Sequence, residues 1–217
     1  MPSSSPPVLI TPGLAVHPRA AWADGLDDPG PLPEEVPGDV RTLVVHHSAS
    51  SNDYGPDDAA TKIRVFHAFH TGPEKGWPDV AYNFFVDRYG GVWEGRAGSL
   101  AGPVIGDATA GNQGFTQLVC LIGTFVDEPP PEPAVRALIE VLAWLADRYR
   151  IDTTPGATTT FVSRGSNRWP TGATVTVPTI TGHRDLSRTE CPGDAAYALV
   201  TGPLPGLVTA RRSPLAP

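Results

Sequence analysis

Gly182–Asp194 reads GHRDLSRTECPGD and joins a histidine to one of the two cysteines of the chain, eight positions later. Imidazole nitrogen and thiolate sulfur are preferred protein ligands of zinc. Pro192 and Gly193 close the segment, which has too many turn residues to predict a helix. We therefore expect His183 and Cys191 to reach one ion from the same side of a turn, with a third ligand supplied from elsewhere.

The candidate for this third ligand is His46, near the end of the apolar run TLVVHH (Thr42–His47). The run is β-rich and bounded by turn residues, which predicts a buried strand. Because side chains alternate along a strand, only one of His46 and His47 can face the site, and we assign His47 to packing or hydrogen bonding. A single strand-end histidine is more often structural than a ligand, so spacing alone leaves both interpretations open.

The composition excludes several classes of protein. The chain has 217 residues, of which 40% are apolar and 18% charged, and this fits one globular domain with a substantial core. A net charge of −7 without a run of Lys or Arg argues against nucleic acid as a partner. No apolar stretch reaches the roughly 18–20 residues of a membrane span. Cys120 is predicted to be a small buried side chain, with a Cys120–Cys191 disulfide as the alternative.

Strands that alternate with helices predict an α/β domain with a central mixed sheet. Residues 1–40, rich in Pro, Gly, Ser and acids, are expected to form an extended arm, 41–202 the domain, and 203–217 a loose tail. Helices are predicted from Gly55 onward, over 129–148 and over 194–200, a hairpin over 81–94, and a central strand over 118–125. Residues 153–181 are predicted to form an inserted β-ribbon.

Three motifs together resemble one known family. VHHSAS (45–50), WPDVAYNFFVDRYGGVWEGR (77–96) and GHRDLSRTECPGD occur in the order found in the zinc amidases of the peptidoglycan recognition protein and type 2 amidase family. The resemblance covers about residues 40–200 and implies the single-domain α/β fold of that family. The ribbon and the run GNQGFTQLVCLIGTF (111–125) are similar to the bacterial, actinobacterial-type branch.

The resemblance implies one zinc ion per chain, bound by His46, His183 and Cys191, and hydrolysis of the amide between N-acetylmuramic acid and L-alanine of peptidoglycan. Three protein ligands leave the fourth position of zinc to water, whose pKa the ion brings toward neutrality. Active relatives have a tyrosine in the VAYNF strand and a polar residue two positions before the cysteine. Here these are Tyr82 and Thr189, the expected catalytic residues, and neither is an evident general base.

The substrate is expected to contact Trp77, Asn83 and Arg96. Glu94 and Arg96 are also predicted to form a structural ion pair. Relatives often carry a histidine in the following loop, where this chain has Ala108, so contacts made there by relatives are not expected here.

Other polar residues receive weaker predictions. Asp185 either orients a metal ligand or caps a turn, and the sequence does not choose between the two. His67 and His70, three apart on the helix after Gly55, are assigned to solvated surface, although they could face a groove.

Two functional interpretations follow from the motifs. The first is a zinc amidase, favoured because binding-only relatives often lack the cysteine that this chain retains as Cys191. The alternative is a non-catalytic peptidoglycan-binding module with a structural or vestigial zinc. The amino-terminal stretch MPSSSPPVLITPGL does not have the pattern of a signal peptide. We nevertheless expect a monomer outside the cytoplasm, secreted or associated with the cell wall, or else a phage-type lysin.

Overall fold

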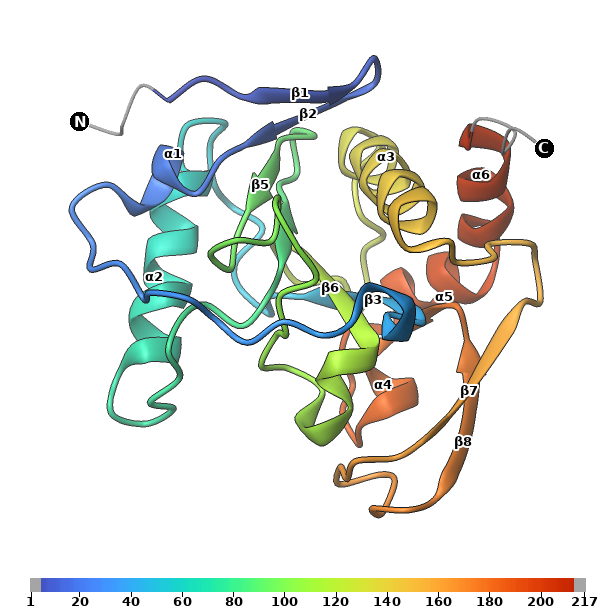
Figure 1. Cartoon of the computed structure of the whole chain (residues 1–217). Helices are drawn as coiled ribbons and strands as arrows, with labels where there is room; N and C mark the ends of the chain where they lie inside the picture. The colour runs from blue at the N-terminus through green and yellow to red at the C-terminus, as the bar shows by residue number, and fades with distance from the viewer. Residues whose placement is uncertain (1–4, 213–217) are drawn as a thin grey trace.

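The computed structural model describes residues 5–212 and has a seven-stranded mixed sheet covered by helices on both faces (Figure 1). The strand order is β1-β2-β5-β4-β6-β3-β9. The main-sheet strands are β1 (Val8–Thr11), β2 (Leu14–His17), β3 (Thr42–His47), β4 (Phe84–Val86), β5 (Val92–Glu94), β6 (Thr116–Leu121) and β9 (Ile180–Gly182). The predicted α/β domain with a mixed central sheet is confirmed.

Six α-helices and two 3₁₀ helices connect or cover these strands within the described residues. The α-helices are α1 (Ala20–Ala23), α2 (Ala59–Thr71), α3 (Glu132–Tyr149), α4 (His183–Leu186), α5 (Asp194–Thr201) and α6 (Leu204–Arg211), and the 3₁₀ helices are η1 (Pro37–Asp39) and η2 (Ala110–Phe115). None of the α-helices in residues 5–212 is both long and apolar enough to cross a membrane.

The middle of the sheet is parallel and buried on both faces. β3 lies between β6 and β9 and runs parallel to both. Every residue of β3 and β6 is buried, as expected for apolar runs in strands covered on two sides. Because β3 and β9 are parallel, their carboxyl ends lie at one edge of the sheet. This topology brings His46, near the end of β3, close to His183, which directly follows β9.

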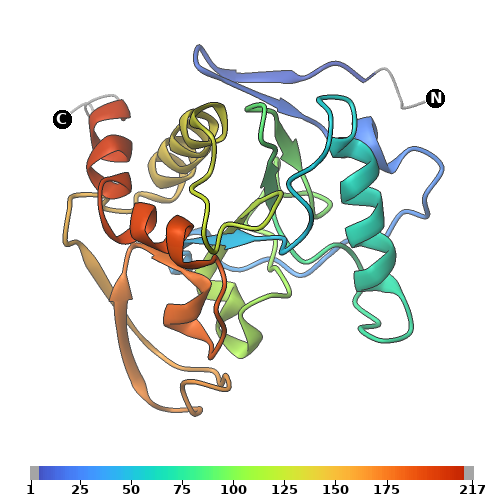
Figure 2. The same ribbon diagram turned by 180° about the vertical axis from the view of Figure 1, so that it is seen from behind.

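Helices α3 and α2 lie on opposite sides of the sheet (Figures 1 and 2). Leu138 and Leu142 of α3 belong to the same buried cluster as Val45 of β3. On the other face, Ile63 of α2 is buried with Cys120 of β6. Full burial of such aliphatic side chains stabilises the fold by about 1.5–3 kcal/mol each.

The helix predicted from Gly55 onward is α2, and it buries only some of its apolar side chains. Asp58 is the N-cap residue of this helix, and Ile63 is fully buried. Val65 and Phe69, however, are 61% and 49% exposed. The buried stripe of this helix instead runs through Ile63 and His70, which are separated by seven positions, or two helical turns.

Both ends of the described range, residues 5–212, are more ordered than predicted. In the expected arm, β2 pairs with β5, and the Trp22 indole donates a hydrogen bond of 2.6 Å to the Glu94 carbonyl. In the expected tail, α6 buries Leu204 and Val208 in the α3 cluster. The prediction of a loose tail is therefore wrong for 203–212, and 213–217 lie outside the described residues.

The predicted ribbon is present as a separate two-stranded sheet of β7 (Thr158–Val162) and β8 (Thr174–Pro178). Phe161, Val175 and Val177 on its inner face are buried, whereas their neighbours along the strands are exposed or half-buried. The ribbon projects beyond the sheet on the side of α4 (Figure 1). It ends at residue 178, because Ile180–Gly182 joins the main sheet as β9.

Candidate metal centre and groove

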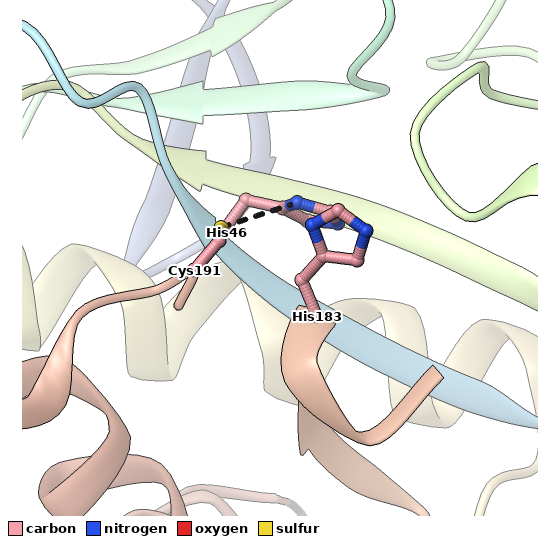
Figure 3. A group of neighbouring side chains, drawn as sticks. All are labelled: His46, His183 and Cys191. Carbon is pink, nitrogen blue, oxygen red and sulfur yellow. Dashed lines mark hydrogen bonds between the residues drawn. The ribbon is translucent and has the colours of Figure 1, made fainter. Parts of the chain in front are cut away.

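The structure brings His46, His183 and Cys191 together at the carboxyl edge of the sheet (Figure 3). One donor atom from each residue lies within 4.8 Å of the others. The Sγ atom of Cys191 is 3.6 Å from Nδ1 of His46, and the two imidazole centroids are 4.5 Å apart. Tetrahedral zinc, with Zn–S of about 2.3 Å and Zn–N of about 2.0–2.1 Å, places such S and N ligands about 3.6 Å apart. The three side chains therefore fit one zinc ion.

Strand alternation and one helical turn position the donors. His46 faces the site from β3, while His47 faces the other way, where its Nδ1 accepts a hydrogen bond of 3.3 Å from the Phe125 amide. His183 is the first residue of α4, so the prediction that this segment lacks helical structure is wrong. Cys191 returns to the cluster because its carbonyl accepts a bond from the Arg184 amide at 3.0 Å.

Burial favours the neutral form of all three side chains. Burial lowers the pKa of His46 well below 6.5 and that of His183 to about 4, so both imidazoles are neutral at pH 7 and can act as ligands. Burial raises the pKa of the Cys191 thiol to about 12, and a bound cation would reverse that shift. The His47 amide lies 3.4 Å from Sγ and would stabilise a thiolate.

Tyr82 lies beside the donors and Thr189 lies at the surface next to Cys191. The Tyr82 ring centroid is 5.0 Å from that of His46. Burial raises the pKa of Tyr82 well above 10, so its hydroxyl remains a hydrogen-bond donor. Thr189 is exposed, and its Oγ1 accepts a bond of 3.3 Å from the Cys191 amide. Of the two predicted catalytic residues, Tyr82 is thus placed directly against a candidate metal ligand.

A groove of about 480 Å³ opens beside this cluster. Tyr82 and His183 line it together with Phe69, His70 and Trp77. Its wall also includes Lys75, Asp107, Ala108, Ala110 and Gln113. The structure therefore places Trp77, one of the predicted substrate contacts, in the same groove as a candidate metal ligand.

His70 lies in the groove, which was the less favoured of the two positions that the sequence left open, and not at the solvated surface. It is 7% exposed, its Nδ1 accepts a bond of 3.2 Å from the Ala81 amide, and its ring lies 5.1 Å from that of Trp77. Burial, followed by the charge of Lys75, lowers the pKa of His70 to about 4. The sequence signal that could have found it is its spacing of seven residues from the buried Ile63. His67 is also not solvated surface, because it lies 3.5 Å from the buried carboxylate of Asp79.

Asn83 belongs to the scaffold, and the prediction that it contacts substrate is wrong. Its side chain is fully buried. Its Nδ2 donates to Ser99 Oγ at 3.1 Å and to the Val104 carbonyl at 2.8 Å. Its Oδ1 accepts from the Leu118 amide at 2.9 Å. These bonds connect the loop that follows β5 to strand β6. Both polar atoms of the Asn83 amide are therefore already bonded to protein groups.

Arg96 is likewise placed behind the groove wall, so the structure does not support a substrate contact. It is 2% exposed and forms an ion pair of 2.5 Å with Asp107, a groove residue. The predicted ion pair with Glu94 is also wrong. The Glu94 carboxylate instead accepts bonds from the Arg19 and Leu100 amides, each at 3.0 Å.

Asp185 caps the turn that carries His183. Its Oδ2 accepts bonds from Thr181 Oγ1 at 2.6 Å and from the Gly182 amide at 3.1 Å, and its Oδ1 accepts one from the Tyr197 hydroxyl at 2.8 Å. Of the two roles that the sequence left open, the structure confirms the turn cap.

Comparison with known proteins agrees with this arrangement. Residues 36–194 match the family described as N-acetylmuramoyl-L-alanine amidase. Pig N-acetylmuramoyl-L-alanine amidase is 30% identical over 188 residues, which are 86% of this chain but only 27% of that protein. Mouse peptidoglycan recognition protein 1 is 29% identical over 200 residues, 88% of this chain and 89% of that protein.

Solved structures share the fold. Drosophila PGRP-LB gives a TM-score of 0.66 at 24% identity, with 86% of this chain and 92% of that chain covered. Human PGRP-IBETAC in complex with glycosamyl muramyl pentapeptide gives a TM-score of 0.65 at 23% identity, with 88% and 96% covered. The relatives named here are animal proteins, and the bacterial branch expected from the sequence stays a prediction. The match over residues 36–194, well over half of the chain, shows that the protein belongs to the N-acetylmuramoyl-L-alanine amidase family.

Proposed function

We propose that this protein is a zinc-dependent amidase that hydrolyses the amide between N-acetylmuramic acid and L-alanine of peptidoglycan. The observation that carries the proposal is the convergence of His46, His183 and Cys191 beside a groove that also contains Tyr82. Membership of the family supports the same reaction. Human PGRP-IBETAC, which shares the fold, was solved with a muramyl pentapeptide, and this supports a related ligand here.

His46, His183 and Cys191 would hold the zinc ion, which when bound supplies a Lewis acid and lowers the pKa of a coordinated water. Their neutral imidazoles and buried thiol are a donor set that suits zinc better than magnesium or calcium. The amide of His47, 3.4 Å from Sγ, would hold the cysteine in its orientation.

Tyr82 would act on the carbonyl oxygen of the scissile amide. As negative charge develops on this oxygen, a hydroxyl that is fixed in a water-poor site donates a stronger hydrogen bond than it does in the ground state. The rings of His46 and Phe85, with centroids 5.0 and 5.5 Å from that of Tyr82, hold the tyrosine in place. Thr189, next to Cys191 at the mouth of the site, would bind the same oxygen or the leaving amine.

The groove would hold the glycan-peptide next to these residues. Trp77 and Phe69 offer apolar ring faces, while Lys75 and Gln113 offer polar groups. The Nδ1 atom of His70 accepts a backbone hydrogen bond, so in the neutral ring the proton is on Nε2 and His70 serves as a donor rather than as a general base. Because peptidoglycan lies outside the cytoplasm, we place the protein there as a secreted or wall-associated monomer, with a phage-type lysin as the alternative.

The test compares the wild-type protein with Cys191→Ser, and uses Cys120→Ala as a control that removes the other cysteine. We expect about one zinc per wild-type chain and release of stem peptides from purified peptidoglycan, both lost in Cys191→Ser and both retained in Cys120→Ala. Zinc binding without cleavage of any wall preparation would favour the alternative, a peptidoglycan-binding module. A wild-type protein that is folded, purified without chelator and free of zinc would contradict the metal centre.

A further inference from the structure

The helix that carries His183 cannot satisfy its last carbonyl groups with its own backbone amides. α4 is a single turn of four residues, and the last carbonyls of any helix lack intrahelical partners. Three side chains from the ribbon tip, defined as residues 163–173 between β7 and β8, supply these partners. Arg168 Nη1 donates to the Arg184 carbonyl at 3.0 Å, Trp169 Nε1 to the Asp185 carbonyl at 2.9 Å, and Ser166 Oγ to the Leu186 carbonyl at 2.8 Å.

The ribbon tip also bonds to the segment between His183 and Cys191. Asn167 Oδ1 accepts a bond from the Arg188 amide at 2.7 Å, and Asn167 Nδ2 donates to the Arg188 carbonyl at 3.4 Å. Arg188 directly precedes Thr189 and lies three positions before Cys191. The tip therefore contacts the backbone at 184, 185, 186 and 188, in the segment that joins His183 to Cys191.

The ribbon tip is itself held in one conformation. Ser166 Oγ accepts bonds from the amides of Arg168 and Trp169 at 3.2 and 3.0 Å, and the Ser166 amide donates to the Trp169 carbonyl at 2.8 Å. The Trp169 ring packs against the buried cluster that contains Phe161 and Leu186. Ser166 and Trp169 thus combine contacts within the tip with contacts to α4.

On its other side the ribbon tip is bonded to the groove wall. The Gly111 amide donates to the Gly165 carbonyl at 2.9 Å. Asn112 accepts from the Arg164 amide at 2.7 Å and donates to Ser163 Oγ at 3.2 Å. These η2 residues lie between Ala110 and Gln113, which both line the groove. One loop therefore connects the metal-binding turn to the wall of the groove.

We propose that the ribbon tip is a positioning device for the metal centre, with Ser166 and Trp169 as its main positioning residues. Its hydrogen bonds set the orientation of α4 and hence of the His183 imidazole before an ion binds. Without them the carbonyls would bond to water, and the turn would have to be ordered at the moment of binding, which weakens affinity. The inference rests on the proposed zinc centre but not on its catalysing any reaction.

The test uses Trp169→Phe, which keeps an aromatic ring but removes the indole donor, Ser166→Ala, and the double variant. Thr176→Ala is the matched control, because this exposed ribbon residue bonds through its hydroxyl to Thr160 Oγ1 and not to α4. Zinc affinity is measured by competition with a chelator, and the absorption spectrum of the cobalt(II)-substituted protein reports the ligand geometry. Circular dichroism and the melting temperature of the metal-free protein report the fold.

Each single variant removes one hydrogen bond to α4 and is expected to bind zinc roughly two- to tenfold more weakly. The double variant is expected to lose roughly 10- to 100-fold, as for other residues that orient metal ligands. The cobalt bands of the double variant should shift, while Thr176→Ala stays at wild-type affinity.

Variants with wild-type zinc affinity and cobalt spectrum, but a lower melting temperature, would overturn the proposal and leave the tip a purely stabilising element. If the wild type binds zinc but does not cleave peptidoglycan, the proposed function fails. The zinc affinities and cobalt spectra of the variants still decide the role of the tip. If the wild type does not bind zinc, the positioning proposal falls with the metal centre.

Discussion

Replacing Tyr82 by Phe removes one hydroxyl from the proposed reaction site and leaves the packing of the ring unchanged. Within residues 5–212 the Tyr82 hydroxyl has no hydrogen-bond partner in the protein, while its ring is held by His46, His70 and Phe85. The substitution should therefore change the free energy of unfolding by no more than about 0.5 kcal/mol. Loss of one donor to a developing oxyanion typically lowers kcat by roughly 10²–10³, which is about 2.7–4 kcal/mol of transition-state stabilisation.

The assay is stem-peptide release from a soluble muramyl peptide, followed by mass spectrometry at saturating and at low substrate. We expect kcat of Tyr82→Phe to fall by roughly 10²–10³. KM and zinc content should stay near wild type, because the hydroxyl acts mainly on the transition state. Because burial holds the pKa of Tyr82 well above 10, the wild-type rate should show no ionisation of this residue below pH 9. A Tyr82→Phe enzyme with wild-type kcat would refute the assigned role.

Three further predictions concern stability. Asn83→Ala leaves buried partners on Ser99, Val104 and Leu118 unsatisfied, so urea unfolding should show a loss of about 3 kcal/mol or more; a loss below about 1 kcal/mol would contradict the structural role of Asn83. The folded-state pKa of His70 is about 4, against 6.5 for the free side chain, so the folded protein binds fewer protons than the unfolded chain between these values. The stability contributed by neutral His70 is present above pH 6.5 and is lost as the pH falls toward 4. His70→Gln should make the free energy of unfolding fall less steeply over this pH range. If the free energy of unfolding depends on pH identically in the two proteins, the lowered pKa of His70 is disproved. Zinc at about 1,000 times its Kd should stabilise the protein by about 4 kcal/mol and raise Tm by roughly 10 °C, an increment that a chelator abolishes; an equal Tm with and without metal would argue against the site.

The features that the sequence predicted correctly depend on local patterns. TLVVHH predicted β3 because a continuous apolar run suits a strand covered on both faces, and alternation then placed His46 and His47 on opposite sides. The ribbon was predictable from its β-branched runs and central turn. The three candidate metal ligands could not be predicted from local patterns alone, because the sequence separation of His46 and His183 does not determine their distance in space. The family resemblance supplied that link, and the parallel pairing of β3 with β9 gives its physical basis.

The errors lie where partners are remote in sequence. Asn83 directly follows Tyr82, and Arg96 is the last residue of the same motif, yet the bonds of Asn83 reach 16 to 35 residues along the chain. Such partners cannot be read from a local pattern. α6 was missed because only Leu204 and Val208 are buried in it, a signal too short to distinguish a helix from a tail. The contacts of the ribbon tip with α4 and Arg188 belong to the same class, since they join residues 16 to 21 positions apart.

The most direct test of the proposed function is a titration of the metal-free protein with zinc, in which release of stem peptide from a muramyl peptide is measured at each addition. We predict that activity rises in proportion to added zinc and reaches a plateau at about one equivalent per chain, and that Cys191→Ser shows no rise. Full binding of one equivalent of zinc without amide cleavage, or cleavage that does not depend on zinc, would contradict the proposed zinc amidase.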